Sequence, residues 1–235
     1  GTGKTELVGI IAETMKRAMY TIDMGTIQDA QSAMIGVHRL NSDGKSMFDY
    51  APFTEYIQQP QAIILLDEIN RGGTSSQNIL FPCLDRRRYL PVDISDSGSV
   101  RKIPVSPETV FIATANVGNE YGGTQAIDRA LMDRFFIIEL DYPTQENEIA
   151  VIINRTGIDK KHASAIVKVH NKIREQYKKE ELGCTVSVRH SLECAELVRD
   201  GFTIESALNS IIMPLFQDGI GANERTKIKT ILAAY

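Results

Sequence analysis

The feature that most restricts the fold of this chain is an unbroken run of apolar residues that ends in two carboxylates. Residues 62–66 read Ala-Ile-Ile-Leu-Leu, and Asp67 and Glu68 follow directly. A strand that is apolar at every position is buried on both faces, as in a parallel sheet covered by helices. Residues 110–115 form a second run of this kind. The pattern predicts an α/β fold with the two carboxylates at the end of a central strand.

Helical and extended stretches alternate around these runs up to about residue 142. Apolar and β-branched residues predict further strands over residues 19–24 and 135–140. Apolar residues at helical spacing predict helices over residues 6–18 and 75–84. The first part of the chain is therefore expected to be a parallel sheet flanked by helices.

Two segments of this first part are predicted to be inserted hairpins. Residues 36–50 contain the turn signal Asn-Ser-Asp-Gly at positions 41–44, between short strand-like flanks. Residues 89–105 have the same character, with Asp-Ser-Gly-Ser at positions 96–99.

Beyond Pro143 the strand signals stop and helices follow one another. Four helices are expected to begin after residues with good capping side chains, namely Thr144, Asp159, Ser187 and Thr203. A fifth helix is expected over residues 222–234. We therefore place the domain boundary near Pro143, with an α/β domain over residues 1–142 and a small all-helical lid over residues 143–235.

The chain begins Gly1-Thr2-Gly3-Lys4-Thr5, the second half of the phosphate-binding loop G-x-x-x-x-G-K-[ST]. Glycines allow backbone N–H groups to turn toward phosphate oxygens, and the following helix directs its positive end at the anion. Lys4 would contact the β and γ phosphates, and the Thr5 hydroxyl would bind Mg²⁺. The front of the motif and the strand before it are not part of this sequence.

The carboxylates after the central strand supply the complementary chemistry. We expect Asp67 to hold the Mg²⁺ shell together with Thr5, and Glu68 to polarise the water that attacks the γ-phosphate. Asn116 follows the apolar run 110–115 and is expected to orient the same water and to report the state of the nucleotide. These residues, with Lys4, predict a nucleoside triphosphatase.

Three arginines are candidates for completing such a site. Arg134 follows a predicted helix directly and could act as an arginine finger on a neighbouring subunit's γ-phosphate. Arg129 is the reserve candidate for that role. Arg189 opens a helix of the second domain, from which it could reach the nucleotide and couple its state to rotation of the lid.

Composition excludes several other classes of protein. The formal net charge is −4, which argues against a duplex-DNA binder and makes nucleic acid a poorly supported partner. No apolar run approaches the ~20 residues of a membrane span, and no secretory signal is visible, so a cytoplasmic protein is expected. The three cysteines lack metal-ligand spacing and are expected to be free thiols. His162 and His170 are expected on the solvated face of a helix.

Taken in this order, the motifs resemble those of AAA+ ATPases over essentially the whole chain. Residues 1–5 correspond to Walker A and residues 63–68 to Walker B, and Asn116, Arg134 and Arg189 correspond to sensor 1, the arginine finger and sensor 2. The sequence Asp-Glu-Ile-Asn-Arg at positions 67–71 resembles the signature of the MoxR and dynein-related branch. The two predicted hairpins match the helix-2 insert and the pre-sensor-1 hairpin of that branch in position.

The resemblance implies a motor that binds ATP and Mg²⁺ and assembles as a ring, usually a hexamer. Such motors remodel a client protein, often through a partner with a von Willebrand A domain. Residues 113–116, 123–125 and 132–134 are also similar to the small ATPase subunit of aerobic cobaltochelatase. The motor of a metal-chelatase complex is therefore an alternative function to a MoxR-type remodelling ATPase.

Two further hypotheses belong to other classes. Three consecutive arginines at positions 86–88 would suit a DNA-acting helicase or a nuclease-coupled motor, although they also suit a solvated helix end. A nucleotide-gated scaffold without turnover is disfavoured because both Glu68 and Asn116 are present. No guanine-reading Asn-Lys-x-Asp motif occurs, so ATP is expected, although relatives of the McrB type use GTP on a similar core.

Overall fold

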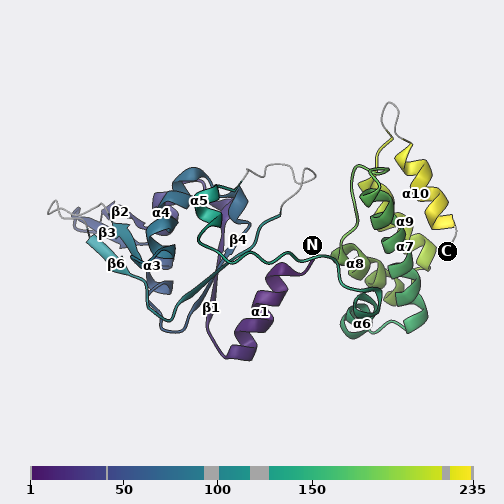
Figure 1. Cartoon of the computed structure of the whole chain (residues 1–235), viewed down its shortest axis with the longest axis horizontal. Helices are drawn as coiled ribbons and strands as arrows, with labels where there is room; N and C mark the ends of the chain where they lie inside the picture. The colour runs from purple at the N-terminus through teal and green to yellow at the C-terminus, as the bar shows by residue number, and fades with distance from the viewer. Residues whose placement is uncertain (1, 41, 93–100, 117–126, 219–222, 234–235) are drawn as a thin grey trace. The chain divides into compact units, whose positions relative to one another are not determined.

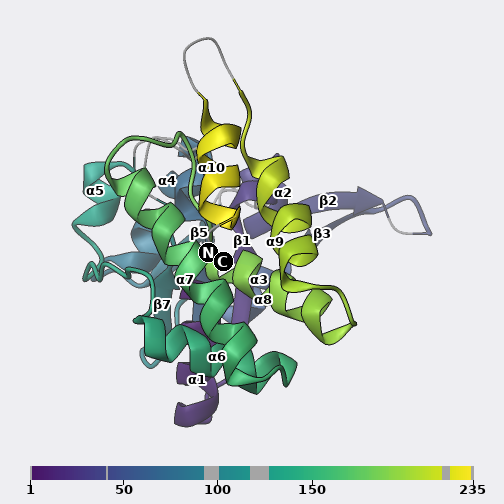
Figure 2. The ribbon, with the colours of Figure 1, turned by 90° about the vertical axis from the view of Figure 1, so that its right-hand side faces the viewer.

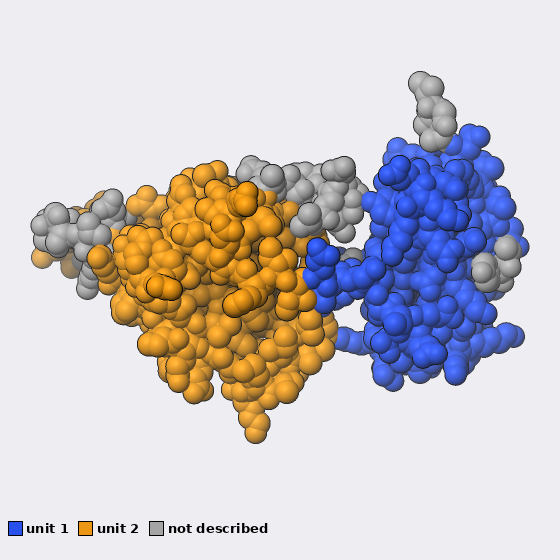
Figure 3. Space-filling view, in the orientation of Figure 1, with its two compact units in different colours: residues 1–3, 139–235 blue, residues 4–138 orange. Residues whose placement is uncertain are grey.

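The computed structural model describes residues 2–40, 42–92, 101–116, 127–218 and 223–233. The chain divides into two compact units (Figure 3). One, here called the sheet unit, comprises residues 4–138, and the other, the helical unit, comprises residues 139–235 with residues 1–3. Each unit has a hydrophobic core of its own.

The sheet unit is built on three parallel strands in the order β1-β4-β7, of which β1 and β4 are labelled in Figure 1. These are β1 (Met19–Asp23), β4 (Ile63–Asp67) and β7 (Val110–Ala113). Their registers are continuous, with β4 paired to β1 on one side and to β7 on the other. The parallel sheet flanked by helices confirms the predicted fold class.

The central strand β4 is apolar throughout because its two faces pack against different clusters. Ile63 and Leu65 contact Val8 and Ala12 of helix α1 (Lys4–Met15). The alternate residues of the strand belong to the larger core cluster on the opposite face. The side chains on both faces of the strand are therefore removed from water, and burying each of them contributes roughly 1.5–3 kcal/mol.

Short helices complete the sheet unit on the side of the larger cluster. The longest is α4 (Thr74–Leu84), which the sequence predicted. Others, which the sequence analysis did not predict, are single turns that pack few residues each. They are α2 (Ala30–Met34), α3 (Pro52–Tyr56) and the 3-10 helices η1 (Met24–Thr26) and η2 (Ile69–Arg71), while α5 (Arg129–Met132) lies where a helix end was expected.

Both predicted hairpins are present. Strands β2 (Gly36–Leu40) and β3 (Ser46–Tyr50) pair antiparallel and project from the body of the sheet unit (Figure 2). Strands β5 (Tyr89–Val92) and β6 (Arg101–Pro104) form the second hairpin, whose predicted tip lies outside the described residues. Gly36 has φ +139°, and a Cβ there would lie 2.2 Å from the carbonyl oxygen of Asp49, so this position requires glycine.

The strand predicted over residues 135–140 is absent, which corrects the sequence analysis. These residues form neither helix nor strand, and Phe136 and Ile138 are almost fully exposed. Apolar composition makes a segment suitable for a strand, but a strand forms only where a neighbour takes up its backbone hydrogen bonds. No described strand pairs with this segment.

The helical unit contains five helices, as expected, within the residues that the structure describes. The first four begin after the predicted capping residues, and the Thr144, Asp159 and Thr203 side chains each accept a backbone N–H bond. They are α6 (Gln145–Thr156), α7 (Lys160–Lys178), α8 (Val188–Arg199), α9 (Ile204–Ile212) and, after the 3-10 turn η3 (Met213–Leu215), α10 (Glu224–Ala233). The boundary predicted near Pro143 falls in the irregular segment before α6 and stays a prediction.

A buried ion pair joins three helices of this unit. Glu148 of α6 and Arg174 of α7 make two hydrogen bonds of 2.6 and 2.9 Å, and both residues are under 5% exposed. Ser191 of α8 donates to the same carboxylate at 2.6 Å. Arg174 also donates to the carbonyl of Val186 at 3.0 Å and lies over the ring of Tyr142. The charges are thus enclosed and supplied with partners.

His170 lies wholly inside the helical unit, which corrects its predicted place on a solvated helix face. Its Nδ1 lies 2.8 Å from the carbonyl oxygen of Ile166, and its Nε2 is buried with no described hydrogen-bond partner. Burial lowers the pKa of His170 to about 4, and the nearby Arg174 acts in the same direction. This imidazole is therefore neutral at neutral pH. The three cysteines are free, as predicted.

Candidate nucleotide site

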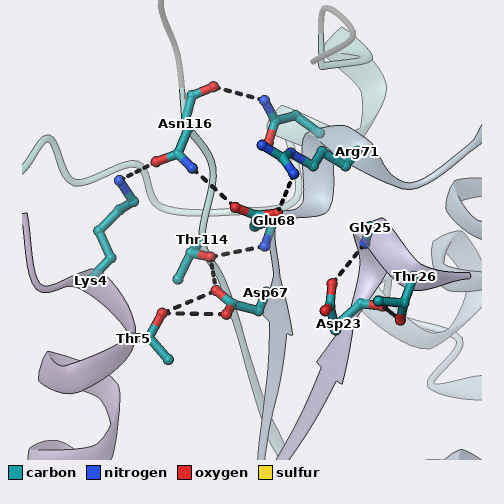
Figure 4. Close-up of polar contacts among 11 residues, drawn as sticks. Lys4, Thr5, Asp23, Gly25, Thr26, Asp67, Glu68, Arg71, Thr114 and Asn116 are labelled. Carbon is teal, nitrogen blue, oxygen red and sulfur yellow. Dashed lines mark hydrogen bonds and ion pairs between the residues drawn. The ribbon is translucent and has the colours of Figure 1, made fainter. Parts of the chain in front are cut away.

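The amino end of α1 lies beside the carboxyl ends of β4 and β7 (Figure 4). Gly3 directly precedes the helix with φ +85°, a conformation that glycine adopts without strain. The Thr5 hydroxyl lies 3.2 and 3.4 Å from the two carboxylate oxygens of Asp67. Lys4 Nζ donates to Asn116 Oδ1 at 2.7 Å. Residues more than 60 positions apart in sequence are thereby brought to one edge of the sheet.

Asp67 is held by a second hydroxyl that the sequence analysis did not assign. Thr114 is buried, and its hydroxyl donates to Asp67 Oδ1. The hydroxyl oxygen of Thr114 in turn accepts the backbone N–H of Glu68 at 3.0 Å. Because one hydroxyl serves as donor and acceptor, Thr114 fixes both consecutive acidic residues relative to β7.

Glu68 has the left-handed backbone conformation, with φ +53° and ψ +48°. A residue other than glycine costs of the order of 1–3 kcal/mol there, and such residues cluster at functional sites. Its Oε1 accepts from Asn116 Nδ2 at 3.3 Å, and its Oε2 lies 3.2 Å from Arg71 Nη1. The backbone turn thus directs the carboxylate toward Asn116 and Arg71, away from the apolar strand.

Asn116 connects the two halves of the cluster. Its side chain accepts from Lys4 and donates to Glu68, so its two amide atoms face opposite charges. Its backbone carbonyl accepts from Asn70 Nδ2 at 2.8 Å. Asn70 is buried, and its Oδ1 has no hydrogen-bond partner among the described residues. The turn after β4 is therefore tied to the end of β7 through a buried side chain.

The structure brings together Lys4, Thr5, Asp67, Glu68 and Asn116, which the sequence analysis assigned to one site. Thr2 and Gly3 precede them in the chain, and Gly1 lies outside the described residues. The roles of all these residues stay predictions.

Arg134 lies elsewhere in the sheet unit. Its guanidinium carbon is 4.6 Å from the ring centroid of Phe81 on α4, and its Nη1 donates to the carbonyl of Ala130. Its Nε is buried with no described partner. Arg129, the reserve candidate, is exposed. Neither of these two contacts of Arg134 involves the Lys4–Asn116 cluster.

Arg189 belongs to the helical unit, where it is exposed in the first turn of α8. The helix begins with a reciprocal cap, in which the Ser187 N–H donates to His190 Nδ1 at 3.1 Å. Partial burial lowers the pKa of His190, which favours the neutral ring that this acceptor role needs. The start of the helix that carries Arg189 is thus well defined.

Thr114, Asn70 and Arg71 are the site residues whose roles sequence reasoning missed. Thr114 is the single hydroxyl in the apolar run 110–115, which was a usable signal. Asn70 and Arg71 follow the two carboxylates after Ile69, but only the left-handed turn at Glu68 shows that Asn70 reaches Asn116 and that Arg71 folds back onto Glu68.

The donor set at this edge suits a hard divalent cation. The Thr5 hydroxyl and the Asp67 carboxylate present oxygen atoms within 3.4 Å of one another. Mg²⁺ is commonly held by one or two protein oxygens, with phosphates and waters completing its shell. Among the described residues, no group of three or more His, Cys, Asp or Glu side chains could bind a metal by itself.

The family description "AAA domain (dynein-related subfamily)" matches residues 1–135, more than half of the chain. The chain belongs to this family and is therefore an ATPase of the AAA+ class. A second description, "CbbQ/NirQ/NorQ C-terminal", matches residues 148–228. Together these two matches place the chain in the MoxR-like branch that includes CbbQ, NorQ and NirQ.

Individual relatives agree with this assignment. The chain is 30% identical to BssE of Thauera aromatica, which carries a chaperone name, over 88% of the chain and 70% of that protein. It is 28% identical to NorQ of Paracoccus denitrificans, over 93% of the chain and 78% of that protein. It is 27% identical to the denitrification regulatory protein NirQ of Stutzerimonas stutzeri, over 93% and 76%.

Among solved structures, a RuvB mutant of Thermotoga maritima is similar over the whole chain, with a TM-score of 0.57 and 19% identity. The chain spans 66% of that structure, slightly less than two thirds, and the likeness shows the fold alone. Within the described residues, no helix is both long and apolar enough to cross a membrane.

Proposed function

We propose that this protein is an ATP-hydrolysing motor of the MoxR type that remodels a client protein or complex. The observation that carries the proposal is the convergence of Lys4 and Thr5 with Asp67, Glu68 and Asn116 at the carboxyl ends of parallel strands. Ligands of open α/β sheets bind at this edge, and the amino end of a helix favours an anion there.

The chemistry assigned to each residue follows from its partners. Lys4 exchanges Asn116 for the β and γ phosphates of ATP, because a phosphate oxygen is a stronger acceptor for an ammonium than an amide is. Glu68 accepts the proton of the attacking water, which Asn116 orients from the other side. Thr5 and Asp67 would hold Mg²⁺, which neutralises charge on the phosphates when bound.

Two arginines complete the proposed mechanism from outside this cluster. Arg134 acts in trans on the γ-phosphate of the next subunit in a homo-oligomer, which is proposed to be a hexameric ring. To do so it must leave its place over Phe81, where its Nε lacks a partner. Arg189 reads the γ-phosphate from the helical unit and couples it to movement of the lid.

The remodelling role is supported by the relatives rather than by the site. BssE bears a chaperone name, and NirQ is named as a regulatory protein. We therefore propose that this motor acts on a protein partner, with a von Willebrand A-domain protein as the adaptor. The projecting β2–β3 hairpin is the proposed contact with the client.

The test is the rate of ATP hydrolysis per subunit, measured against protein concentration in the chain carrying a complete phosphate-binding loop. A rate that rises and then saturates is expected, because the site is completed between subunits. Arg134→Ala should remove this rise while nucleotide binding persists, since a trans arginine finger is worth roughly 10³–10⁵ in rate. Arg129→Ala tests the reserve candidate and should leave the rise intact. Full turnover by the Arg134→Ala protein would refute the assigned role.

A further inference from the structure

We infer that Arg71 is a positioning residue for ATP hydrolysis, holding the Glu68 carboxylate in the orientation in which it accepts a proton from water. The inference rests on the proposed function, because it assumes that Glu68 is the base. Arg71 lies in the 3-10 turn η2, three residues after Glu68, and its Nη1 is 3.2 Å from Glu68 Oε2.

The two oxygens of the Glu68 carboxylate are held from two elements. Oε2 faces Arg71 of η2, and Oε1 faces Asn116, which follows β7. A carboxylate has about four acceptor positions, so one partner on each oxygen leaves positions for water. Both side chains of the ion pair keep about a third of their surface, 32% for Glu68 and 40% for Arg71. The carboxylate is therefore fixed in direction and still accessible.

The backbone favours this arrangement at both ends. The left-handed conformation of Glu68 turns the chain so that the Arg71 N–H donates to the Glu68 carbonyl at 2.8 Å, which closes the short turn. Asn70, between them, anchors the turn to the Asn116 carbonyl. Because the backbone is fixed at both ends, Glu68 retains only the freedom of its side chain, whose direction the Arg71 guanidinium determines together with Asn116.

Gly25 lies close to the Glu68–Arg71 pair. A Cβ placed on Gly25 would lie 3.3 Å from Arg71 Cδ, 3.3 Å from Asp23 Oδ1 and 3.5 Å from Glu68 Oε2. The first two distances are tighter than ordinary contacts, whereas the backbone of Gly25 is not in the left-handed region. Gly25→Ala therefore offers a way to displace Arg71 slightly without removing any charge.

A residue that orients the base affects the chemical step more than binding of the nucleotide. We expect Arg71→Ala to lower kcat about 10- to 100-fold with little change in KM, because misplacing a reacting group by about 1 Å can cost 10²-fold. Arg71→Lys should recover part of the loss, since an ammonium can reach one carboxylate oxygen. Gly25→Ala should give a smaller fall in kcat than Arg71→Ala.

The decisive experiment is a double-mutant cycle in the full chain with a complete phosphate-binding loop. It compares the parent, Glu68→Gln, Arg71→Ala and the double variant by kcat, KM and thermal unfolding. If Arg71 acts through Glu68, Arg71→Ala should change kcat less than about twofold in the Glu68→Gln background, because groups that act as a unit are not additive. Lys172→Ala, which removes an exposed ion pair with Glu175 three residues further along α7, is the matched control.

Each other outcome overturns one specific claim. A parental kcat for Arg71→Ala would overturn the inference, and so would a rise in KM alone or an undiminished loss in the Glu68→Gln background. A fall in kcat with a lowered unfolding temperature and no recovery in Arg71→Lys would show a merely structural role. If Glu68→Gln itself kept full turnover, the proposed function of Glu68 would fail instead.

Discussion

Each unit of this protein contains a glutamate paired with an arginine, and the two pairs differ in almost every physical respect. In the helical unit, Glu148 and Arg174 make two short hydrogen bonds and their side chains are 0% and 5% exposed. In the sheet unit, Glu68 and Arg71 touch through one atom pair at 3.2 Å and are 32% and 40% exposed.

The difference indicates what each pair is for. Glu148 is fully buried and accepts three hydrogen bonds from Arg174 and Ser191, so the pair is closed to solvent and joins helices. Glu68 has a strained backbone and unfilled acceptor positions. Completeness of hydrogen bonding thus separates a structural charge pair from one arranged for a ligand.

The largest effect on stability is expected when the Glu148–Arg174 pair is broken. Arg174→Met should lower the free energy of unfolding by about 3–5 kcal/mol, because it leaves a carboxylate buried without a partner. Chemical denaturation monitored by circular dichroism measures this change. Arg199→Ala, which removes an exposed pair with Asp200, should change stability by less than about 1 kcal/mol. A parental stability for Arg174→Met would contradict the structural role.

Burial of His170 in the helical unit should make the stability of the protein depend on pH. Its pKa is lowered to about 4 in the folded protein, from an ordinary value near 6.5, mainly by burial. As pH falls from 6.5 to 4 the unfolded chain takes up a proton that the folded chain does not, so stability is lost in this window and is full above it.

The expected loss is about 3 kcal/mol between pH 7 and pH 4, from the two pKa values. Urea unfolding of the parent and of His170→Leu across this range measures it. The variant should lack this part of the pH dependence, since Leu does not titrate. Parallel pH profiles for the two proteins would show that His170 is not the group responsible.

Thr114→Val tests the hydroxyl that joins Asp67 to Glu68. It removes both hydrogen bonds at nearly constant volume, so unfolding should become easier by about 1–3 kcal/mol. Turnover should fall as well, because Glu68 loses a backbone anchor. Thr114→Ser, which keeps the hydroxyl, is the control. Equal turnover in the parent and Thr114→Val would show that Thr114 has no part in positioning Glu68.

The smallest effect is expected for Arg71→Ala on stability, in contrast with Arg174→Met. A pair that keeps about a third of its surface in water is worth about 0–1 kcal/mol, so the unfolding temperature should barely change even though turnover falls. A loss of stability comparable with that of Arg174→Met would mean that both pairs are structural and would contradict the distinction between them.

The sequence predicted those parts of the fold in which local pattern and tertiary contacts agree. The apolar run before Asp67 predicted a strand buried on both faces, which the structure contains, and the capping residues of the helical unit began helices where expected. The segment 135–140 failed because its composition suits a strand but no described strand pairs with it. Burial of His170 was missed because polar character was taken to mean exposure.

For the site, spacing along the chain brought Lys4, Thr5, Asp67, Glu68 and Asn116 to one edge, but it could not show how they are held. The left-handed turn at Glu68 is a backbone property that the residue types do not predict. The contacts of Thr114, Asn70 and Arg71 depend on that turn. The resemblance to a cobaltochelatase subunit stays a prediction beside the relatives NorQ, NirQ and BssE.

The most direct test of the account is ATP turnover and ATP binding by Glu68→Gln, in the chain with a complete phosphate-binding loop. Removing a general base at constant size should lower turnover by about 10²–10⁴, while the Kd for ATP stays close to that of the parent. Turnover equal to that of the parent would contradict the central claim, because the carboxylate at the end of β4 would then have no part in the hydrolysis.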